Sequence, residues 1–431
     1  MGKLRVGIAG LGTVGRGVAK LFADGASRLN QNIQLVAVTA RTQNQDRGVD
    51  LSGYQWFSDP VALASDPSVD VFVELIGGAE GVAKASVEAA LGRGAHVVTA
   101  NKALVAVHGT RLAELAESNG AKLLFEAAVG GGVPMVKALK ESVAGSRASS
   151  VAGILNGTCN YILTEMENSG RSFEAVLSEA QGLGYAEADP TTDVGGFDAA
   201  HKLTILSAIA FGTRPDYEHV RIEGIKRVTL TDIRLAAKLG YRIKLIAKGA
   251  LGDGAVEMHV RPACLPYDHP LANVGSSLNA LVVDAEPAGQ LTFIGRGAGE
   301  GPTAASVASD LIDLAEGRAG FAFGKSLAQL STAPRATPAE RGRYYLRLLV
   351  KDRPGVVAAI SDRLAHEEIS IESFLQMPVH DGPAVPIVLT TQTCARAKME
   401  AAVRAIEALD VTAEAPFVMP VEQSGPHWSR S

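Results

Sequence analysis

The feature that most constrains this chain is a glycine pattern close to its start. The pattern G-x-G-x-x-G is formed by Gly10, Leu11, Gly12, Thr13, Val14 and Gly15. It follows an apolar run at residues 4–9, which predicts a strand, and opens a periodic run at residues 14–23, which predicts a helix. In that context the glycines permit a tight turn, a close approach of the backbone to a pyrophosphate, and close helix–strand packing. The pattern therefore predicts a dinucleotide site at a helix N-terminus, a glycine turn without a ligand being the alternative.

The end of the second predicted strand, residues 34–39, bears on the choice of dinucleotide. An NAD site usually has an Asp or Glu about 20 residues beyond the glycines, where it binds the ribose 2′-hydroxyl. Here the strand continues into Ala40 and Arg41, without an acid. The guanidinium of Arg41 is suited to a 2′-phosphate, although a solvated surface charge explains this residue equally well. The pattern predicts NADP(H), preferred over NAD(H) or shared with it.

The chain divides into three blocks. Up to about residue 130, strands are expected at residues 4–9, 34–39, 69–75, 96–99 and 122–125 and helices at 14–23, 82–92 and 111–119, which predicts a parallel sheet with helices on both faces. Residues 131–330 show helical patterns first, for instance at 173–181 and 197–211, and strand-like alternation later, and residues 331–342 are predicted to be a linker. Residues 343–422 follow the order β-α-β-β-α-β, with the last strand at 411–419, which gives a small sheet with two helices on one side. The fold class is α/β, with a Rossmann-type domain, an α+β domain and a ferredoxin-like domain.

Composition excludes several classes of protein. Of the 431 residues, 41 are Lys or Arg and 46 are Asp or Glu, so the formal net charge of −5 argues against a nucleic-acid partner. The cysteines, Cys159, Cys264 and Cys394, lie too far apart to suggest a zinc site or a disulfide framework. No apolar run reaches the roughly 18 residues of a membrane span, and the first apolar run is too short for a signal peptide. We expect a cytoplasmic protein.

Two lysines and an aspartate are candidates for chemistry. Lys102 follows the predicted strand at residues 96–99, at the sheet edge where open α/β sheets bind ligands. Asp198 and Lys202 share a face of a predicted helix that continues into the apolar residues 203–211, so the pair is expected to be buried. The alternatives are a solvated lysine and an exposed ion pair. Proton transfer by a lysine would require its pKa to fall, through burial or a second ammonium group.

A carboxylate followed by glycines forms a third candidate site. Glu126 precedes the glycines at residues 130–132, and a backbone this pliable can turn its carbonyl oxygens toward a hard cation. A bend connecting two domains explains the same segment, and the residues alone favour the bend.

Longer motifs carry a resemblance that covers nearly the whole chain. They are GLGTVG (10–15), TANKAL (99–104), FEAAVGGGVPM (125–135), NGTCNYIL (156–163), LGYAEADPTTDVGGFDAAHKL (183–203) and GAGEGPTAASV (297–307). Together they resemble homoserine dehydrogenase in its form without an aspartate kinase region. Arg296 stands before Gly297 where the family commonly has Pro, which departs from the pattern. Residues 343–422, with VKDRPGV at 350–356, resemble an ACT domain, a module that senses small molecules.

The resemblance implies a reaction and roles for individual residues. The reaction is the NAD(P)-dependent interconversion of L-homoserine and L-aspartate 4-semialdehyde, on the route to threonine, methionine and isoleucine. Lys202 is implied to exchange the proton at the substrate oxygen, with Lys102 as a second functional lysine and Asp198 orienting the oxygen or its lysine. Glu187 is implied to bind the substrate ammonium group, and Gly184 to lie beside substrate and cofactor.

The resemblance also implies residues for the cofactor and for an ion. Thr99 and Gly301 are implied to contact the cofactor, so that a segment at about 300–320 returns to the first domain. A monovalent-cation loop, for Na⁺ or K⁺, is implied at Glu126, Val129, Gly131 and Val133, the last three acting through carbonyl oxygens.

Regulation and assembly follow from the ACT resemblance. ACT domains pair side by side and hold amino acids at the shared edge, so L-threonine is the expected effector. The family resemblance implies a homodimer through the central sheet, or a homotetramer if the terminal modules pair as well. A module that only stabilises an oligomer is the alternative. For the whole chain, the alternatives are another ACT-containing dehydrogenase, such as one resembling phosphoglycerate dehydrogenase, and a nucleotide-dependent amino-acid sensor without turnover. His201 is the rival to Lys202, because histidine titrates near neutral pH.

Overall fold

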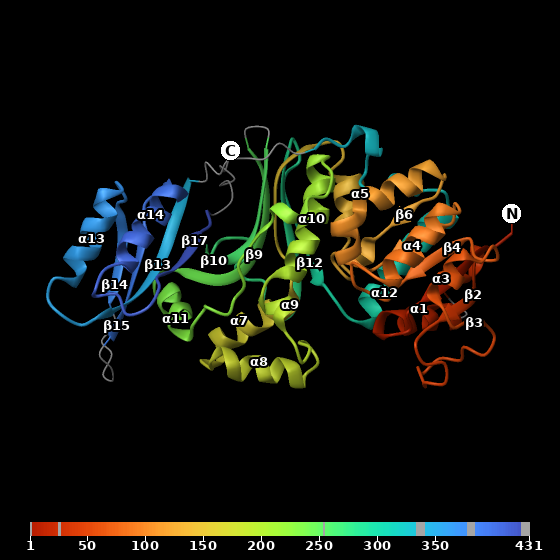
Figure 1. Ribbon diagram of the computed structural model, residues 1–431, viewed down its shortest axis with the longest axis horizontal. Coiled ribbons are helices and arrows are strands. Elements are labelled where there is room, and N and C mark those ends of the chain that lie inside the picture. The colour runs from red at the N-terminus through yellow and green to blue at the C-terminus, as the bar shows by residue number, and fades with distance from the viewer. Residues whose placement is uncertain (1, 25–26, 253–254, 333–340, 377–383, 424–431) are drawn as a thin grey trace.

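Two β-sheets organise the molecule, with the first block at one end and the ACT-like block at the other (Figure 1). The computed structural model describes residues 2–24, 27–252, 255–332, 341–376 and 384–423. Within these ranges, every helix is too short or too polar to serve as a membrane span.

The first sheet is parallel throughout and has the strand order β3-β2-β1-β4-β5-β6. Its strands are β1 (Leu4–Ala9), β2 (Ile33–Thr39), β3 (Gln55–Phe57), β4 (Val71–Glu74), β5 (His96–Thr99) and β6 (Leu123–Leu124). Its helices are α1 (Thr13–Ala23), α2 (Leu29–Asn32), α3 (Pro60–Ser65), α4 (Val82–Gly92) and α5 (Lys102–Ser118), joined by α12 (Glu300–Ala315). The sequence pattern predicted this sheet except for β3.

One helix of the first block begins earlier than predicted. We expected a helix at residues 111–119, but α5 begins at Lys102. The side chain of Asn101 accepts a hydrogen bond from the backbone N–H of Leu104 at 3.1 Å and so caps the helix nine residues upstream. Lys102 is therefore the first residue of a helix that starts at the carboxyl end of β5.

The second sheet is mixed and has the order β12-β11-β7-β9-β10-β17-β13-β15-β14, with β8 on β10 and β16 on β13. Its strands are β7 (Arg147–Ile154), β8 (Arg221–Ile222), β9 (Tyr241–Gly252), β10 (Ala255–Pro266), β11 (Leu278–Glu286), β12 (Gly289–Arg296), β13 (Arg341–Lys351), β14 (Ile371–Gln376), β15 (Ala384–Thr391), β16 (Cys394–Ala395) and β17 (Phe417–Val421). The associated helices are α6 (Met135–Lys137), α7 (Gly157–Ser169), α8 (Phe173–Gly182), α9 (Thr191–Val194), α10 (Phe197–Phe211), α11 (Leu230–Lys238), α13 (Val356–His366) and α14 (Arg396–Glu407). Short 3₁₀ turns lie at Glu126–Ala128, Tyr217–His219 and Leu327–Gln329, and a π turn at Ala138–Ser142.

The β-α-β-β-α-β order is present in the last block, but two of its limits differ from prediction. The final strand, expected at residues 411–419, lies at Phe417–Val421. Pro416 has no N–H to donate, and Arg227 Nη2 binds its carbonyl oxygen at 2.9 Å, so the chain breaks from β13 before re-entering the sheet. The predicted linker at 331–342 is wrong at its end, because β13 begins at Arg341. Residues 333–340 and the tail beyond Gln423 lie outside the described residues.

The last block is joined to the central sheet. Strand β17 pairs with β10 at Val421 and Cys264, and the backbone N–H of the next residue donates to the Cys264 carbonyl oxygen at 2.9 Å. Asp232 of α11 is fully buried at this junction, where Tyr345 Oη lies 3.0 Å and Arg347 Nε 2.9 Å from its Oδ1. The ACT-like block and the central block therefore share a sheet and a buried ion pair.

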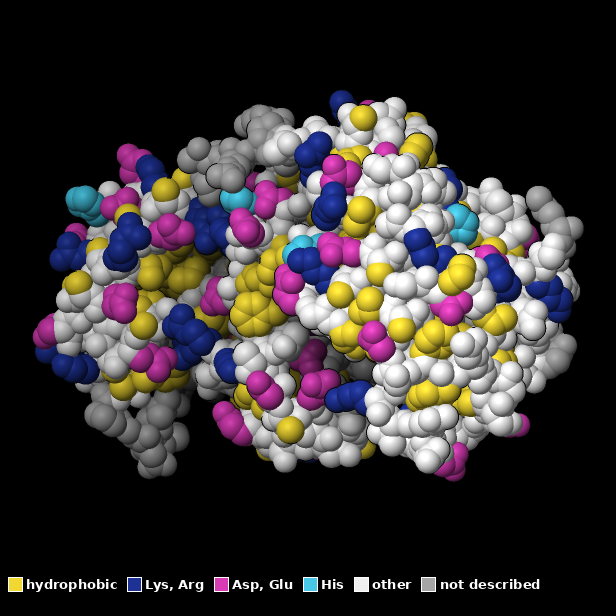
Figure 2. Space-filling view, turned by 45° about the vertical axis from the view of Figure 1, so that its right-hand side comes forward, with side chains coloured by type: hydrophobic (Ala, Val, Ile, Leu, Met, Phe, Trp, Pro, Cys, Tyr) yellow, Lys and Arg dark blue, Asp and Glu magenta, His cyan; other side chains and the backbone are white. Residues whose placement is uncertain are grey.

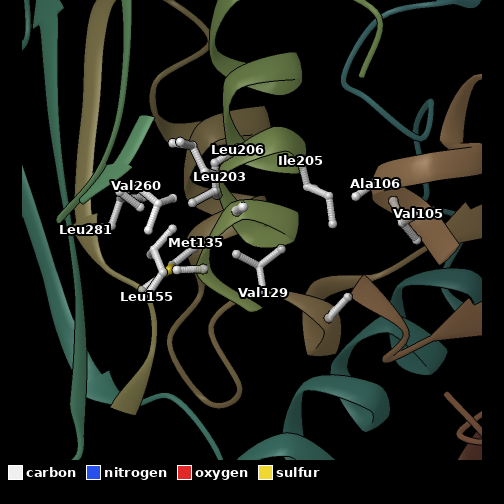
Figure 3. Close-up of a cluster of buried hydrophobic side chains, with 14 of the residues drawn as sticks. Val105, Ala106, Val129, Met135, Leu155, Leu203, Ile205, Leu206, Val260 and Leu281 are labelled. Carbon is white, nitrogen blue, oxygen red and sulfur yellow. The ribbon is translucent and has the colours of Figure 1, made fainter. Parts of the chain in front are cut away.

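Helix α10 lies between the two halves of the core (Figure 3). Its Ile205 points toward Val105 of α5, while Leu206 points toward the central sheet, where Val260 and Leu281 lie. All these side chains belong to one buried cluster. Because α10 is packed on both sides, polar residues at its first turns are held in a fixed position between the two sheets.

Candidate active site

The glycine turn between β1 and α1 has the geometry of a phosphate-binding turn. Gly10 has φ +97°, and a Cβ there would lie 2.4 Å from the Leu75 carbonyl oxygen. A Cβ on Gly15 would lie 1.9 Å from the Gly10 carbonyl oxygen. A Cβ on Gly12, by contrast, would meet no described atom within 4 Å, and Gly12 provides no side-chain cap for α1. Two glycines close the turn and the third leaves its backbone approachable, which fits a dinucleotide pyrophosphate.

The first turn of α12 lies beside this turn. Glu300 accepts hydrogen bonds from Arg16 Nε at 2.6 Å and Lys20 Nζ at 2.7 Å, both on α1. Gly301 follows Glu300, and a Cβ on Gly301 would have no neighbour within 4 Å among the described atoms. The start of α12, nearly 300 residues away in sequence, is thus held against α1, the helix that follows the glycine turn.

Arg41 lies at the same edge of the sheet. The Gly10 N–H donates to the Thr39 carbonyl oxygen at 2.9 Å, which places the end of β2 next to the glycine turn. Arg41 follows two residues later and is exposed. Its position suits a group attached to the adenosine ribose, and its exposure also suits a solvated surface charge.

Thr99 uses its hydroxyl group within the fold. It donates to the buried carboxylate of Glu74 and accepts from the Asn101 N–H at 2.9 Å. The other oxygen of Glu74 accepts from the backbone N–H groups of Ile76 at 2.7 Å and Gly77 at 2.9 Å. Glu74 therefore shapes the loop after β4 at the cofactor edge. Sequence analysis missed it, although an acid at the end of an apolar strand was a visible signal.

The central feature of the site is a carboxylate between two lysines. Lys202 Nζ lies 2.9 Å from Asp198 Oδ2, and Lys102 Nζ lies 3.2 Å from Asp198 Oδ1. Lys202 Nζ also donates to the Leu155 carbonyl oxygen at 2.8 Å. Helices α5 and α10, one from each half of the molecule, begin here. The structure thus brings together two ammonium groups a hundred residues apart in sequence.

The two lysines differ in how deeply they are buried. Asp198 and Lys202 are 5% and 8% exposed, whereas the Lys102 side chain is 40% exposed. Burial would raise the pKa of Asp198, but the charges of Lys202 and Lys102 hold it well below its usual value. The Asp198 charge outweighs burial and raises the pKa of Lys102. The expectation of a lowered lysine pKa is therefore wrong for Lys102, because a carboxylate lies between the two ammonium groups.

Two further polar residues complete the cluster. Asn156 Nδ2 donates to Asp193 Oδ1 at 2.8 Å and to Asp198 Oδ2 at 2.9 Å. Its Oδ1 accepts from the Cys159 N–H at 2.8 Å and caps α7. Burial raises the pKa of Asp193. Asn156 was not among the predicted site residues, although it begins the NGTCNYIL motif and is a helix-capping residue type before an apolar run.

The loop between α8 and α9 carries Glu187 and Gly184. Thr158 Oγ1 donates to the Tyr185 carbonyl oxygen at 2.6 Å, which ties the loop to the start of α7. Glu187 is exposed, and its charge is among those that raise the pKa of Lys102. Gly184 has φ +75° at the turn. Figure 2 shows a hollow between this lobe and the first domain, with acidic and basic side chains around it.

His201 lies beside the cluster. Its ring stacks on Tyr217 with 4.4 Å between centroids, and burial lowers its pKa. Its Nδ1 is buried without a hydrogen-bond partner in the described part of the chain. Asp198 instead receives its hydrogen bonds from Lys202 and Asn156, which weakens the case for His201 as the proton carrier.

Glu126 lies in the predicted cation loop and is 2% exposed. Its two oxygens accept from the backbone N–H groups of Val136 at 3.1 Å and Lys137 at 2.7 Å. Burial, together with the charge of Asp310, raises the pKa of Glu126 to about 7. Burial likewise raises the pKa of Asp310 to about 6. A cation would relieve this accumulation of negative charge.

The carbonyl oxygens of the loop are partly engaged. The Gly131 oxygen accepts from the Ser306 hydroxyl, and the Val133 oxygen accepts from the Met135 N–H at 2.8 Å. Val129, which lies between Glu126 and Gly131 in sequence, is fully buried. The loop offers several oxygen atoms, but two of its carbonyl oxygens already accept hydrogen bonds, so the loop fits a cation in part. The described residues also hold no group of three or more His, Cys, Asp or Glu suited to a metal.

Comparisons with known proteins agree with this arrangement. Residues 10–126 match the model of the homoserine dehydrogenase NAD-binding domain, residues 134–312 match the model of homoserine dehydrogenase, and residues 344–411 match the ACT domain. The chain is 41% identical to the homoserine dehydrogenase of Neisseria gonorrhoeae, over 97% of this chain and 98% of that one. The chain belongs to the homoserine dehydrogenase family. It is accordingly an oxidoreductase with an NAD(P)-binding domain and a C-terminal ACT domain.

Other homoserine dehydrogenases extend the comparison. That of Bacillus subtilis is 38% identical over the full length of both chains. The crystal structure of a homoserine dehydrogenase from Thiobacillus denitrificans matches with a TM-score of 0.91 at 40% identity, covering 98% of this chain and 99% of that one. A hyperthermophilic archaeal homoserine dehydrogenase in complex with NADPH matches with a TM-score of 0.64 at 27% identity, covering 74% of this chain and 99% of that one.

Proposed function

We propose that this chain interconverts L-homoserine and L-aspartate 4-semialdehyde, in the synthesis of threonine, methionine and isoleucine. The observation that carries the proposal is Asp198, held between Lys202 at 2.9 Å and Lys102 at 3.2 Å where α5 and α10 begin. A nicotinamide bound at the carboxyl edge of the first sheet supplies or accepts the hydride. The chain's own residues then have to manage the proton and the charge on the substrate oxygen.

Lys202 is the proposed proton carrier. An ammonium group has three donors, and Lys202 commits two of them, to Asp198 and to the Leu155 carbonyl oxygen. The third is free to point at the oxygen of the aldehyde, where negative charge develops as the hydride arrives. Asp198 orients the ammonium group, and Lys102 supplies a second positive charge. In the oxidation direction the proton moves the opposite way, and the Lys202 amine accepts it from the hydroxyl group.

Glu187 and Gly184 are proposed to position the other end of the substrate. The Glu187 carboxylate is exposed in the loop next to the cluster, so it can pair with the substrate ammonium group. Gly184, at φ +75°, lets this loop turn toward the cofactor. The Asp193 carboxylate already accepts a hydrogen bond from Asn156 Nδ2 at 2.8 Å, whereas the Glu187 side chain is exposed.

For the cofactor we propose NADP(H), preferred or shared with NAD(H). Gly10, Leu11, Gly12, Thr13, Val14 and Gly15 are proposed to hold the pyrophosphate, with Arg41 at the 2′-phosphate and Thr99, Lys102 and Gly301 near the nicotinamide half. Thr99 would act through its backbone, because its hydroxyl is committed to Glu74. Na⁺ or K⁺ is proposed at Glu126, Val129, Gly131 and Val133.

The domain limits remain those proposed from sequence: residues 1–130 with about 300–320 for the nucleotide domain, 131–330 for the catalytic domain and 343–422 for the ACT domain. The packing of α12 on α1 through Glu300 supports the returning segment. The pairing of β17 with β10 connects the ACT domain directly to the catalytic domain.

For regulation we propose L-threonine at the ACT domain of a homodimer or homotetramer. Gly355, at φ +89°, precedes α13 without a side-chain cap, so backbone N–H groups are available to a carboxylate. Strand β14 ends the sheet order and offers an edge to a second ACT domain, while Ile294 is an exposed apolar residue on the strand at the other end. We further propose a cytoplasmic location, in keeping with three buried free cysteines.

One assay tests the activity directly. Purified protein is mixed with NADPH and L-aspartate 4-semialdehyde, and the absorbance of the reduced nicotinamide is followed. We expect it to disappear with formation of homoserine. Absence of consumption with both NADPH and NADH, in protein shown to bind the nucleotide, would support the sensor without turnover instead.

A further inference from the structure

A cavity of about 600 Å³ lies on the side of the central sheet opposite α10. Val260 of β10 faces α10, because a Cβ on Gly196 would lie 3.1 Å from its Cγ1. Successive side chains of a strand point to opposite faces, so His259 and Arg261 face away from α10 and into the cavity. The ends of β13 and β17 close its other side. Its charged and titratable lining includes Lys248, Glu257, His259, Arg261, Arg341 and Glu422.

Two polar groups in this cavity lack partners. His259 is 6% exposed, and neither of its ring nitrogens has a hydrogen-bond partner within the described ranges. The Oε1 atom of Glu257 is also buried and unpartnered by any described residue. Leaving a buried polar group unsatisfied costs about 1–3 kcal/mol, and folded proteins rarely do so. Two such groups, two residues apart on one face of β10, indicate a place where a ligand completes the hydrogen bonds.

The other two acids of the cavity, Glu422 and Asp284, already have partners. Lys248 pairs with Glu422 at 2.6 Å, and Asp284 accepts from Ser150 at 2.6 Å and from Gln290 at 2.9 Å. Glu257 therefore stands out as an acid whose buried oxygen can receive a cationic donor.

Cationic side chains also line the cavity. Arg261, which lies two residues after His259 on the same face of β10, and Arg341 are among them. Burial, reinforced by the charges of Arg261 and Lys248, holds the pKa of His259 well below its usual value, so the ring is neutral and offers one N–H donor. The cavity thus presents an acceptor for a cation and donors for an oxyanion within a space of small-molecule size.

We propose that this cavity binds a free α-amino acid, with Glu257 receiving its ammonium group and His259 and Arg261 binding its carboxylate. An α-amino acid carries both groups on one carbon, which a simple anion or amine does not. The site is distinct from the ACT edge discussed above. Its regulatory meaning rests on the proposed dehydrogenase activity, whereas binding itself does not.

Strand β10 connects this cavity to the catalytic helix. On one face it carries Glu257 and His259, and on the other Val260 contacts Gly196, which precedes α10. The Val260 carbonyl oxygen also accepts from the Glu223 N–H at 2.7 Å, on the segment packed against the start of α10. Asp198 follows Gly196 by two residues. A ligand that shifts β10 would therefore shift the carboxylate that orients both lysines.

The test measures binding by the full-length protein. Isothermal titration calorimetry is carried out with each of the twenty standard amino acids, with propionate and inorganic phosphate as single-function controls. We expect at least one amino acid to bind and neither control to do so. Glu257→Gln and His259→Gln should each weaken that binding about tenfold or more, because each removes a buried partner of a charged group. Both variants should retain nucleotide binding and dehydrogenase turnover.

Matched controls separate this site from the ACT edge. Asp352→Asn, in the exposed turn before α13, should leave the affinity unchanged. The proposal is overturned if no amino acid binds at 10 mM (about the weakest Kd of interest), if phosphate or propionate binds equally well, or if Asp352→Asn abolishes binding while Glu257→Gln does not. Loss of turnover in the wild-type protein would count against the proposed function and would leave the binding result standing.

Discussion

Two buried carboxylates of this molecule, Asp198 and Glu126, show how differently a fold can treat the same chemical group. Asp198 has two ammonium groups within 3.2 Å, which hold its pKa well below the usual value despite burial. The Glu126 oxygens accept from two backbone N–H groups, and burial, reinforced by the charge of Asp310, raises the pKa of Glu126 to about 7. Burial acts on both acids in the same direction, so the two ammonium groups beside Asp198 account for the difference. One site is permanently charged, and the other titrates near neutral pH.

The largest expected effect tests the compensated site. Lys202→Ala should lower kcat by about 10²–10⁴-fold, because it removes a positioned proton donor. Steady-state kinetics in both directions measure this, and nucleotide affinity should stay within about twofold (a change of less than 0.5 kcal/mol). Lys398→Ala, a surface lysine of α14, is the matched control and should retain full turnover. Near-normal turnover of Lys202→Ala would transfer the proton role to another group.

The second prediction removes the carboxylate between the lysines. Asp198→Asn should lower kcat by about 10²-fold, because both lysines lose the group that orients them. The Asp198 charge raises the pKa of Lys102, so its loss lowers that pKa. Reduction of the aldehyde, which the positive charge of Lys102 is proposed to support, should therefore fail at a lower pH than in the wild type. An unchanged alkaline limb of the pH–rate profile would contradict the electrostatic role.

The third prediction concerns the uncompensated site. Because Glu126 keeps its proton up to about pH 7 in the folded state, the unfolded chain releases that proton first, above about pH 4.5. The free energy of unfolding should thus fall as pH rises from about 4.5 to 7, with a contribution of about 1–3 kcal/mol. Denaturant titrations at several pH values in this range measure the free energy of unfolding. Its decrease with pH should be smaller for Glu126→Gln than for the wild type.

The medium provides the control for that experiment. The titrations are repeated with choline replacing Na⁺ and K⁺. If the proposed cation binds at Glu126, either metal ion should flatten the slope of the wild type and leave Glu126→Gln unaffected. If the free energy of unfolding depends on pH in the same way for the two proteins in every medium, Glu126 does not cause the pH dependence.

The smallest effect is expected where water screens the charge. Arg41 is exposed, and exposed ionic contacts are worth about 0.2–1 kcal/mol. Arg41→Ala should therefore raise the KM for NADP by about two- to fivefold and leave the KM for NAD unchanged. Equal changes for the two nucleotides would show that Arg41 does not meet the 2′-phosphate.

Much of the fold followed from local pattern. The strands and glycines of the first sheet and the limits of α10 could be predicted because each depends on periodicity or on a nearby turn. The union of β17 with β10 could not, because a single residue pair carries it. Lys102, Asp198 and Lys202 could be nominated from type and position. That Asp198 would separate the lysines depends on how α5 and α10 pack, which no local pattern encodes.

The residues that sequence analysis missed share a physical reason. Glu74 and Asn156 act on backbone groups and on other side chains, so their importance lies in partners distant in sequence. A polar residue at a strand end or before a helix looks the same whether it is a simple cap or the support of a reaction centre. Only the three-dimensional arrangement distinguishes the two.

The shared core of the central and ACT blocks has a practical consequence. Tyr345, Phe417 and Val421 belong to the same buried apolar cluster as Val260 and Leu203. Cutting the chain ahead of β13 would uncover that cluster and leave β10 with a bare edge, a combination that promotes aggregation. An engineered form without the ACT domain would therefore need polar substitutions on the uncovered apolar surface, in addition to a shorter gene.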